Sequence, residues 1–450
     1  MTGKKEKFIP MEEGKVSLYT CGPTVYNPAH IGNFRTFLFE DVLKRFLLTA
    51  GYEVCHVMNI TDVDDKTINK SRVEKTSLKE LTDKYTKYFM EDLETIKILP
   101  ADHFPKATNH IEDMIEMIKS LIKKGHAYVT DDGSVYFSIK TFEGYGKLSN
   151  LDFDNQLQSD RIASDEYTKD NPQDFALWKS WKEEDGDIFW KSPWSKGRPG
   201  WHIECSAMST KYLGSQFDIH CGGVDNIFPH HENEIAQNYC SSGSPFVNIW
   251  MHSEHLKLDY KKMSKKLGNI ISVPSLIEKG HTPESIRFAL FSSHYRSKLT
   301  FSELKLIESK KAIHRINDVY DRLKNVQNIK PILPTAYSDF LAALSDDLNT
   351  PKALGILFSF IKDINQKLDE GLLSNENIAK SIYFIESADK IFSFLTTKDK
   401  IPEDLSKLMI RREKARKNRD YKLSDQLRDE ILKKGWIIED TTDGTKCYKA

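Results

Sequence analysis

The sequence predicts an α/β protein in which a parallel-sheet domain carries an insertion and is followed by a helical bundle and a small C-terminal domain. Three observations lead to this fold class. The first 60 residues alternate strand, helix and strand patterns, and apolar residues repeat at helical spacing after about residue 300. The length of 450 residues also suggests about three domains, at ~150 residues each.

The composition fits a globular chain and excludes several classes. Hydrophobic residues make up 39% and aromatic residues 11%, which is enough to build sizeable cores. No stretch reaches the ~20 consecutive apolar residues of a membrane span, and no apolar signal core follows the N-terminus. We therefore expect a cytoplasmic protein without a membrane partner. The 65 Lys and Arg residues balance 66 Asp and Glu residues, so only a local basic patch is expected.

The first element pattern is a β-α-β unit. Apolar residues repeat at helical spacing from about Asn33 to Gly51, and glycine commonly ends a helix. Strand patterns flank this helix at residues 15–21 and 53–60. A strand, a Gly-containing turn, a helix and a strand in this order indicate a Rossmann-type parallel sheet.

The middle of the chain predicts helices and then an insertion. Residues 66–125 have helical patterns, and Asp131-Asp132-Gly133 between two strand-like runs predicts a hairpin. Residues 140–200 are polar and irregular, yet they and Trp201 contain five of the seven tryptophans. We therefore expect an ordered insertion that packs on the core or forms a pocket wall.

The last part of the chain predicts a helical bundle and a separate end. Ser302 is a plausible N-cap, and helical patterns cover 337–349, 351–370 and 376–396. The expected divisions are a sheet domain in two halves (1–118 and 201–250), an insertion (119–200), a loop and stem-contact region (251–300), a bundle (301–398) and a C-terminal domain (399–450).

Two patterns suit phosphate binding. His30-Ile31-Gly32-Asn33 lies between a strand and a helix, where free backbone N–H groups and the helix dipole favour an anion. Residues 261–269 include four lysines, whose ammonium groups can neutralise a triphosphate. Taken alone, the first pattern also fits a surface turn and the second a solvated basic loop.

A third pattern consists of side chains that bind metals. Cys21 closes the first strand, Cys205 lies far along the chain, and His230 or His231 precedes Glu234 by four or three residues. Two thiolates, an imidazole and a carboxylate suit tetrahedral zinc. The sequence has no CxxC pair, so the spacing is weak evidence and leaves the choice between the two histidines open.

A fourth pattern is the run Phe217–Asp225, in which a short apolar strand leads into Gly222-Gly223. At the carboxyl end of a strand, a glycine pair and an acid can hold an adenosine. An ordinary turn fits these residues as well.

Taken in order, these patterns resemble class I aminoacyl-tRNA synthetases, and among them the cysteinyl-tRNA synthetases. His30–Asn33 is similar to the HIGH signature, and residues 262–266 are similar to the KMSKS loop. The cysteinyl family's blocks are matched in order by residues 19–26, 59–66, 200–208, 228–237, 294–297 and 346–351. The resemblance covers nearly the whole chain.

The resemblance implies site residues and cofactors. It implies one zinc per chain, with the ligands Cys21, Cys205, His230 and Glu234, and magnesium that accompanies ATP. It implies that the catalytic residues are His30, Asn33, Lys262 and Lys265. It implies that ATP is bound by Gly22, Thr24, His30, Gly32, Asn33, Gly223, Asp225 and Lys265. Thr61 and Trp201 match positions that border the amino-acid pocket, although Trp201 also fits plain core packing. The cysteines outside the zinc set are expected to be structural.

Two positions depart from the family signatures. Asn33 stands at the fourth HIGH position, where its amide can donate a hydrogen bond to phosphate but cannot carry an imidazolium charge. Lys266 stands at the last KMSKS position and adds positive charge where a hydroxyl is usual. We expect both to tune the activity without abolishing it.

The C-terminal segment has the local basic patch. Between residues 407 and 434, eleven basic and five acidic residues give a net charge of +6, and Trp436 follows. Basic side chains beside an aromatic ring suit unpaired anticodon bases. The candidate tRNA contacts are Arg411, Arg412, Arg416, Arg419 and Trp436. The alternative is a solvated helix with Trp436 in a small core.

The resemblance implies an ATP-dependent ligase that activates L-cysteine and transfers it to the 3′-terminal adenosine of tRNA(Cys), acting as a monomer. We also expect the substrate sulfur to bind the zinc directly, without an editing domain. Three rivals are a cysteine ligase with an amino-sugar acceptor, a catalytically silent RNA-binding paralogue and a zinc hydrolase. The complete helical region and basic end argue against the first, and the intact phosphate and metal patterns argue against the second. The nucleotide signature argues against the third.

Overall fold

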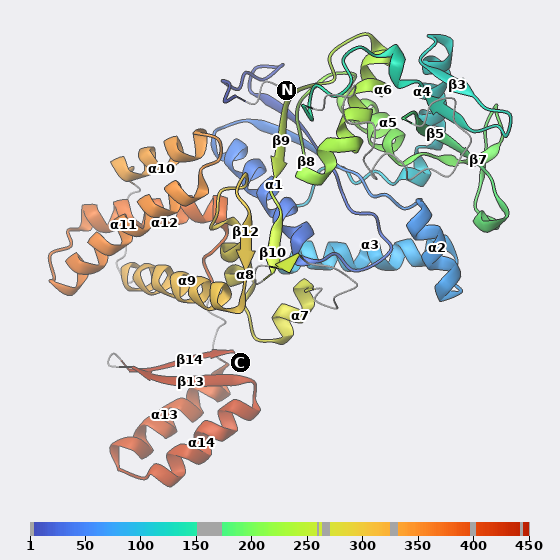
Figure 1. The fold of residues 1–450 in the computed structure, drawn as a ribbon. Coiled ribbons are helices and arrows are strands. Elements are labelled where there is room, and N and C mark those ends of the chain that lie inside the picture. Colours follow the sequence, from blue (N-terminus) through green and yellow to red (C-terminus); the bar gives the residue numbers. More distant parts are fainter. Residues whose placement is uncertain are drawn as a thin grey trace.

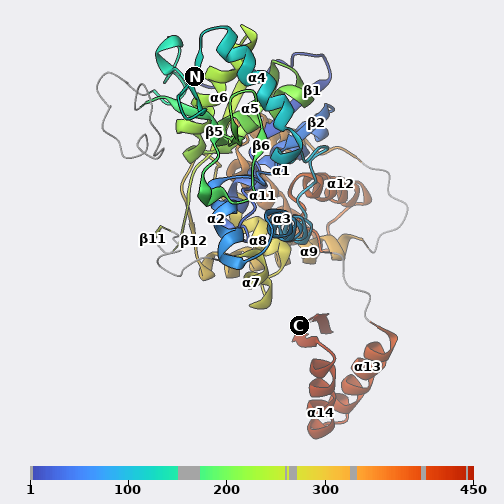
Figure 2. The ribbon, with the colours of Figure 1, turned by 90° about the vertical axis from the view of Figure 1, so that its right-hand side faces the viewer.

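The computed structural model describes residues 4–150, 173–258, 261–262, 271–324, 332–396, 402–441 and 444–449. Figure 1 shows a sheet domain at the top, a helical bundle beside it and a C-terminal unit below. Figure 2 shows from the side that the C-terminal unit stands apart from the rest of the chain. The predicted α/β class with a helical C-terminal part is confirmed.

The central sheet has four parallel strands in the order β2-β1-β8-β9. Their bounds are β1 (Lys15–Thr20), β2 (Glu53–Met58), β8 (Phe217–Gly223) and β9 (Val247–Ser253). Leu18 pairs with His56 on one side and with Ile219 on the other. Because the strands are parallel, the carboxyl ends of β1 and β8 lie at the same edge of the sheet, where Cys21 and Gly223 are found.

Helices lie between these strands along the chain, and the first of them contacts β2, β8 and β9. Their bounds are α1 (Ile31–Thr49), α2 (Asp65–Glu74), α3 (Leu78–Thr95), α4 (Ile111–Lys123), α5 (Trp201–Leu213) and α6 (Glu232–Ser242), with 3₁₀ turns η1 (Ala107–Asn109) and η4 (Val224–Asn226) and the irregular turn η5 (Ile227–His231). Gly51 follows α1 with a φ of +93°, a left-handed conformation that glycine adopts without strain.

The insertion is a five-stranded antiparallel sheet in the order β3-β4-β5-β7-β6. The bounds are β3 (Ala127–Val129), β4 (Val135–Phe137), β5 (Phe175–Ser180), β6 (Trp190–Lys191) and β7 (Lys196–Pro199), with short turns η2 (Ile139–Thr141) and η3 (Glu183–Asp185). The hairpin at residues 131–133 is present, and the Trp178 side chain is fully buried. Part of the predicted insertion, residues 151–172, lies outside the described residues.

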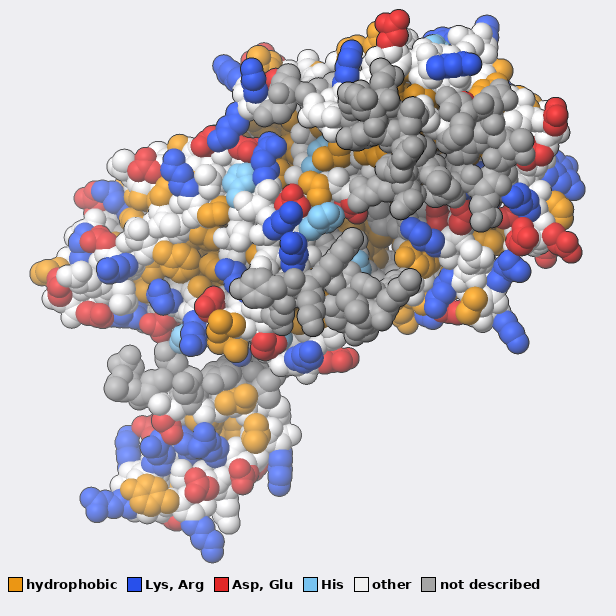
Figure 3. Space-filling view, viewed as in Figure 1, with side chains coloured by type: hydrophobic (Ala, Val, Ile, Leu, Met, Phe, Trp, Pro, Cys, Tyr) orange, Lys and Arg blue, Asp and Glu red, His pale blue; other side chains and the backbone are white. Residues whose placement is uncertain are grey.

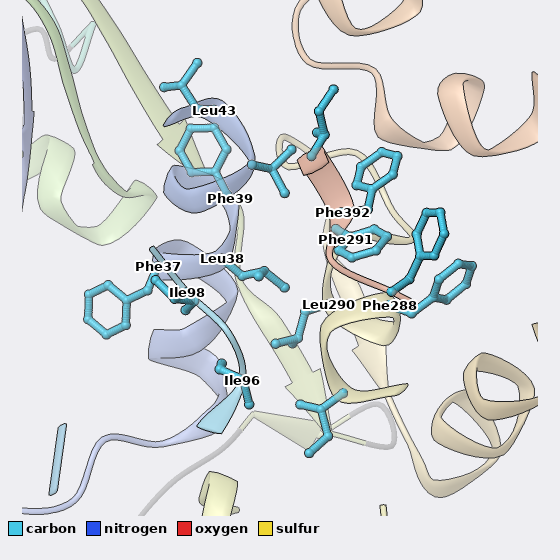
Figure 4. Packing of buried hydrophobic residues seen from close by; sticks show 14 of the residues in the cluster. Phe37, Leu38, Phe39, Leu43, Ile96, Ile98, Phe288, Leu290, Phe291 and Phe392 are labelled. Atoms are coloured by element: carbon cyan, nitrogen blue, oxygen red, sulfur yellow. The ribbon is translucent and has the colours of Figure 1, made fainter. Parts of the chain in front are cut away.

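The bundle contains α8 (Pro283–Phe291), α9 (Glu303–Leu323), α10 (Thr335–Ser345), α11 (Thr350–Asp369) and α12 (Asn375–Phe392). It is joined to the central sheet by α7 (Val273–Glu278) and a small sheet of β10 (Leu256–Leu258), β11 (Lys261–Lys262) and β12 (Leu299–Phe301). Figure 4 shows how apolar side chains of α1, α8 and α12 meet in one core. In that core, the rings of Phe291 and Phe392 stack with centroids 4.7 Å apart.

A buried arginine fixes the bundle to α1. Arg287 of α8 is 0% exposed and donates to the Asp41 carboxylate at 2.7 Å. It also donates to the carbonyl oxygens of Phe392 at 3.1 Å and Ile96 at 2.8 Å. A buried charge that is paired and hydrogen-bonded in this way resists displacement, because removing either partner leaves the other uncompensated. Helix α1 is therefore held by the bundle.

The C-terminal unit has its own core. It consists of α13 (Glu403–Lys417), α14 (Tyr421–Lys433) and a hairpin of β13 (Trp436–Thr441) and β14 (Gly444–Lys449). Its buried apolar residues form a cluster of their own, made up of Leu405, Leu408, Leu427, Ile431, Trp436 and Ile438. None of the helices in the described ranges combines the length and apolar composition that a bilayer span needs.

Candidate active site and metal centre

The N-terminus of α1 is closed by a reciprocal capping box. The His30 Nδ1 atom accepts from the Asn33 backbone N–H at 3.2 Å, and the Asn33 Oδ1 atom accepts from the His30 backbone N–H at 3.1 Å. Asn33 therefore supports the helix start with its oxygen and keeps its amide nitrogen as a donor. The capped end presents the positive pole of the α1 dipole at the carboxyl edge of the sheet.

Two glycines lie at this edge, and at Gly22 the neighbouring backbone leaves no room for a larger residue. A Cβ atom at Gly22 would lie 1.7 Å from the Asn59 carbonyl oxygen, and one at Gly223 would lie 2.5 Å from the Asp225 Oδ1 atom. Thr24 forms a bridge with Thr61, whose side chain is buried. The predicted nucleotide and amino-acid residues on these two segments are thus brought together.

The four zinc ligands implied by the family converge. Ligand atoms of Cys21, Cys205, His230 and Glu234 all lie within 4.8 Å of one another. Cys205 is on α5, His230 lies in η5 and Glu234 lies in the first turn of α6, so three separate segments meet at the end of β1. The His230 Nε2 atom lies 3.1 Å from Glu234 Oε1. His231 also approaches, and together with Cys21, His220 and Glu234 it forms a second group within the same limit.

The electrostatics of this cluster fit a bound cation. Burial raises the pKa of Glu234 to about 7 and lowers the pKa of His230 to about 3. Within the described part of the chain, buried Glu234 Oε1 has no well-aligned hydrogen bond, although His230 Nε2 lies 3.1 Å from it. An orphaned carboxylate oxygen that faces neutral imidazole and thiol groups is costly without a cation. The donor set of two sulfurs, one nitrogen and one oxygen therefore suits zinc.

Residues that contact His230 from outside the group of four ligands orient its imidazole ring. The Trp201 ring stacks on the His230 ring, with centroids 4.2 Å apart and planes inclined by 18°. The His202 Nδ1 atom lies 2.9 Å from the His230 Nδ1 atom, which directs the Nε2 atom of His230 toward the cluster. Trp201 is 39% exposed, so it borders an opening and is not a core residue. Histidines 202, 220 and 252 around this cluster were not identified from the sequence, because no spacing rule links them.

The lysine-rich loop is described only at its borders. Lys262 belongs to β11, whose backbone pairs with Lys257 of β10. Lys265 and Lys266 lie outside the described residues. The backbone N–H of Ile31 at the start of α1 donates to the Ile271 carbonyl oxygen at 2.8 Å. The segment that leaves the loop is therefore fixed next to His30.

The candidate tRNA residues fall into two groups. Arg411, Arg416 and Arg419 are exposed. Trp436, in contrast, is 6% exposed and packs in the small core, as the alternative interpretation had it. Arg412 is also buried, and it donates two hydrogen bonds to Asp440, at 2.8 and 2.9 Å. Neither Trp436 nor Arg412 presents its side chain to a ligand, because the hairpin covers this side of the two helices.

An aromatic residue that the sequence analysis missed lies on the exposed side. Tyr421, the first residue of α14, is 63% exposed and follows Arg419 closely. Figure 3 shows Lys and Arg side chains gathered on the C-terminal unit. An exposed tyrosine among cations suits base stacking, and its position at a helix start next to Arg419 is the sequence signal that could have found it.

Solved structures of aminoacyl-tRNA synthetases share this architecture. A methionyl-tRNA synthetase of Mycobacterium tuberculosis in complex with methionyl-adenylate aligns with a TM-score of 0.61, covering 84% of this chain and 90% of that one at 13% identity. LeuRS of Agrobacterium radiobacter, in a ternary complex, aligns with a TM-score of 0.64, covering 86% of this chain and 85% of that one at 10% identity. The fold is that of class I aminoacyl-tRNA synthetases.

The sequence comparisons give the particular family. Residues 7–311 match the tRNA synthetases class I (C) catalytic domain, and residues 339–396 match the DALR domain. Cysteine–tRNA ligase of Chlamydia pneumoniae is 48% identical over 98% of this chain and 96% of that protein. Cysteine–tRNA ligase of Brachyspira hyodysenteriae is 47% identical over 99% of this chain and 97% of that protein. The chain therefore belongs to the cysteine–tRNA ligase family.

Proposed function

We propose that this chain is an ATP-dependent ligase that activates L-cysteine and transfers it to the 3′-terminal adenosine of tRNA(Cys). The observation that carries the proposal is the group of Cys21, Cys205, His230 and Glu234 beside the capped start of α1. The group of four ligands provides a binding site selective for thiols, and the start of α1 provides a binding site for anions. A sulfur-containing amino acid and ATP can therefore bind next to each other.

The reaction has two steps. A carboxylate oxygen of cysteine attacks the α-phosphorus of ATP, and the bond to pyrophosphate breaks. The 2′-hydroxyl of the terminal adenosine then attacks the cysteinyl carbonyl carbon, loses its proton and releases AMP. Such phosphoryl transfer depends mainly on positioning and charge stabilisation.

The residues at the sheet edge have distinct roles in this scheme. His30, Asn33 and the α1 N-terminus hold phosphate oxygens, because N–H groups and the helix dipole converge there. Gly22, Gly32 and Gly223 let the nucleotide approach the backbone, while Thr24 and Asp225 supply polar contacts. Lys262 and Lys265 neutralise the charge that develops on the triphosphate, which magnesium accompanies.

Cysteine selection is assigned to the metal cluster. Cys21, Cys205, His230 and Glu234 would hold zinc, and Thr61 and Trp201 border the amino-acid pocket. When bound, zinc supplies a preference for a thiolate sulfur over a hydroxyl oxygen, because it is a borderline-soft cation. A pocket that relied on shape alone would separate cysteine from serine only by roughly 10²-fold.

We assign the remaining parts of the chain by their positions. The catalytic sheet is assigned to residues 1–118 and 201–250, and the insertion is assigned to residues 119–200. The signature loop and the stem contact are assigned to residues 251–300. Residues 301–398 form the bundle, and 399–450 read the anticodon with Arg411, Arg416, Arg419 and Tyr421. Because one chain supplies all the residues named here, the proposed unit is a monomer that acts in the cytoplasm, where tRNA is charged.

The experiment is cysteine-dependent ATP–pyrophosphate exchange, followed by charging of tRNA(Cys). Exchange without charging would instead indicate an acceptor other than tRNA, such as an amino sugar. Absence of exchange in the metal-loaded protein would contradict the proposal. Removing the metal with a chelator is expected to abolish the discrimination of cysteine from serine, and readdition of Zn²⁺ should restore it. Unchanged selectivity would contradict the role given to the cluster.

A further inference from the structure

Two of the sequence blocks that match the family have no role in the two-step reaction. Residues 294–297 follow α8, and residues 346–351 span the turn from α10 into α11. The Tyr295 hydroxyl donates to Asp347 Oδ1 at 2.6 Å, and Arg296 donates to both oxygens of the same carboxylate, at 2.7 and 2.9 Å. One aspartate of the second block therefore holds two neighbouring side chains of the first.

The first of these blocks lies against α1. The ring of Tyr295 stacks on the ring of Phe39, with centroids 4.4 Å apart and planes inclined by 13°. Arg35 of α1, which is 3% exposed, donates to the carbonyl oxygens of His294 at 2.9 Å and Ser297 at 3.2 Å. These contacts fix the block relative to the helix whose capped start is proposed to hold the phosphates.

The same block is also bonded to the carboxyl edge of the central sheet. The backbone N–H of Glu254, directly after β9, donates to the Tyr295 carbonyl oxygen at 2.7 Å. The hydroxyl oxygens of Thr36 on α1 and Ser253 at the end of β9 are 2.7 Å apart. The sheet edge, α1 and the block thus form one connected unit, which Asp347 contacts from the bundle.

The turn that carries Asp347 has an uncommon backbone conformation. Asp347 and the next residue, Leu348, have φ angles of +58° and +53°, in the left-handed region that residues other than glycine rarely adopt. Leu348 is buried, and the Thr350 hydroxyl donates to the Phe291 carbonyl oxygen of α8 at 2.7 Å. Such conformations persist where the surrounding contacts enforce them, often at functional sites. The turn therefore presents the Asp347 carboxylate to the other block in a fixed direction.

We propose that Asp347 is a positioning residue for adenylate formation, because it fixes through Tyr295 and Arg296 the segment against which α1 packs. This role rests on the proposed function, since the helix start that it positions is the one assigned to the phosphates of ATP. Loss of the carboxylate should let α1 shift and should weaken the contacts with ATP. Cysteine binding, which is assigned to the metal group, should be retained.

Replacement of Asp347 by glycine separates the carboxylate from the shape of the turn. Glycine adopts a positive φ without strain, so Asp347→Gly keeps the turn and removes the side chain. We expect the KM for ATP in pyrophosphate exchange to rise about 5-fold or more, while the KM for cysteine stays unchanged. An unchanged KM for ATP would show that Asp347 only shapes the turn and would overturn the proposal. An equal rise in both constants would overturn it as well.

The neighbouring aspartate provides a matched control. Asp346 lies in the same turn and pairs with Lys5 at 2.7 Å. Asp346→Asn removes one negative charge, as Asp347→Gly does, and is expected to leave the KM for ATP unchanged. A similar rise in both variants would assign the effect to charge alone and would contradict the positioning role.

A second variant tests the contact through Tyr295. Tyr295→Phe removes the hydroxyl group and keeps the ring that stacks on Phe39, so a smaller rise in the KM for ATP is expected. Asp347→Gly has already lost the acceptor of this hydroxyl, so adding Tyr295→Phe should cause no further rise. A combined effect equal to the product of the two separate effects would exclude the route through Tyr295.

Binding of ATP provides a measurement in the absence of the reaction. Calorimetric titration of the full-length chain with ATP, without cysteine, should give a Kd that is raised in Asp347→Gly and unchanged in Asp346→Asn. Equal Kd values for these two variants would overturn the positioning role. An unaltered chain that binds ATP but shows no cysteine-dependent exchange would instead contradict the proposed function alone.

Discussion

The indole ring of Trp201 lies flat on the imidazole ring of His230, with centroids 4.2 Å apart. The tryptophan opens α5 and the histidine lies in η5, the turn before α6, so the contact joins the segments that supply Cys205, His230 and Glu234 to the proposed zinc site. The stack fixes the plane of the imidazole ring, and with it the direction of the nitrogen that faces Glu234.

Replacing Trp201 should therefore weaken metal binding. An aromatic pair contributes about 0.5–1.5 kcal/mol beyond burial, so Trp201→Ala should lower zinc affinity about 2- to 10-fold, and Trp201→Phe less. Competition with a chromophoric chelator measures this. Trp181→Ala is the matched control, because Trp181 is similarly exposed but lies in the insertion. Equal affinity for Trp201→Ala and Trp181→Ala would refute the role of the stack.

Two substitutions at Asn33 should distinguish its role in capping α1 from its proposed role in binding phosphate. Asn33→Ala removes both the cap oxygen and the donating amide, so adenylate formation is expected to fall about 10-fold or more. Asn33→Asp keeps an oxygen for the His30 N–H but places a negative charge beside the phosphates. We expect this variant to keep its melting temperature and to lose more pyrophosphate exchange than Asn33→Ala. Exchange at the unaltered rate would show that Asn33 does not face the nucleotide.

Asp92 should make stability fall as the pH rises. Burial, with a contribution from Glu91, raises the pKa of Asp92 to about 7. Below about pH 4 the folded and unfolded states are both protonated, and the group contributes nothing. Between about pH 4 and 7 only the unfolded chain releases the proton, so the free energy of unfolding decreases. Asp92→Asn is neutral at every pH and should melt higher than the unaltered chain at pH 8.

The difference in melting temperature between Asp92→Asn and the unaltered chain should disappear near pH 4, as measured by scanning calorimetry. Asp83 on the same helix provides a control of opposite sign, because hydrogen bonds from Lys106 and Lys79 lower the pKa of its carboxyl group. Asp83→Asn is therefore expected to melt lower at pH 8. A lower melting temperature for Asp92→Asn at pH 8 would be inconsistent with this account.

Tyr421 should act in tRNA recognition alone. Stacking of one base on an aromatic side chain is worth about 1–3 kcal/mol, so Tyr421→Ala should lower kcat/KM for tRNA charging by about 5-fold or more. Pyrophosphate exchange without tRNA should stay unchanged. Tyr239→Ala, which alters an exposed tyrosine of α6, serves as the control. Equal charging by both variants would exclude Tyr421 from the interface.

The sequence patterns predicted those helices and strands whose residues contact residues close to them in the chain. The repeat between Asn33 and Gly51 gave α1, which starts two residues earlier because His30 caps it. The hairpin of β3 and β4 was predicted, but β5, β6 and β7 of the insertion were missed, since β5 and β7 pair residues as distant as Trp178 and Pro199. Strand pairing at such separations leaves no periodic signal in either segment.

The same limit applies to the candidate site. Residue types suggested the cluster around Glu234, but only the fold brings Cys21 and Cys205 together and places His220 and His231 against them. Trp436 was expected among the tRNA contacts because basic residues precede it. Its burial depends on the hairpin β13–β14, whose pairing is set by residues after it in the chain.

The separate core of the C-terminal unit has a consequence for the evolution of such chains. Among the residues that the structure describes, every member of its apolar cluster comes from residues 405–447 and none comes from the bundle. Recombination in the short stretch between Thr396 and Pro402 could exchange this unit between relatives without disturbing the catalytic core. The unit that we propose to read the anticodon is thus free to diverge with its tRNA, while Arg287 fixes α1 to the bundle.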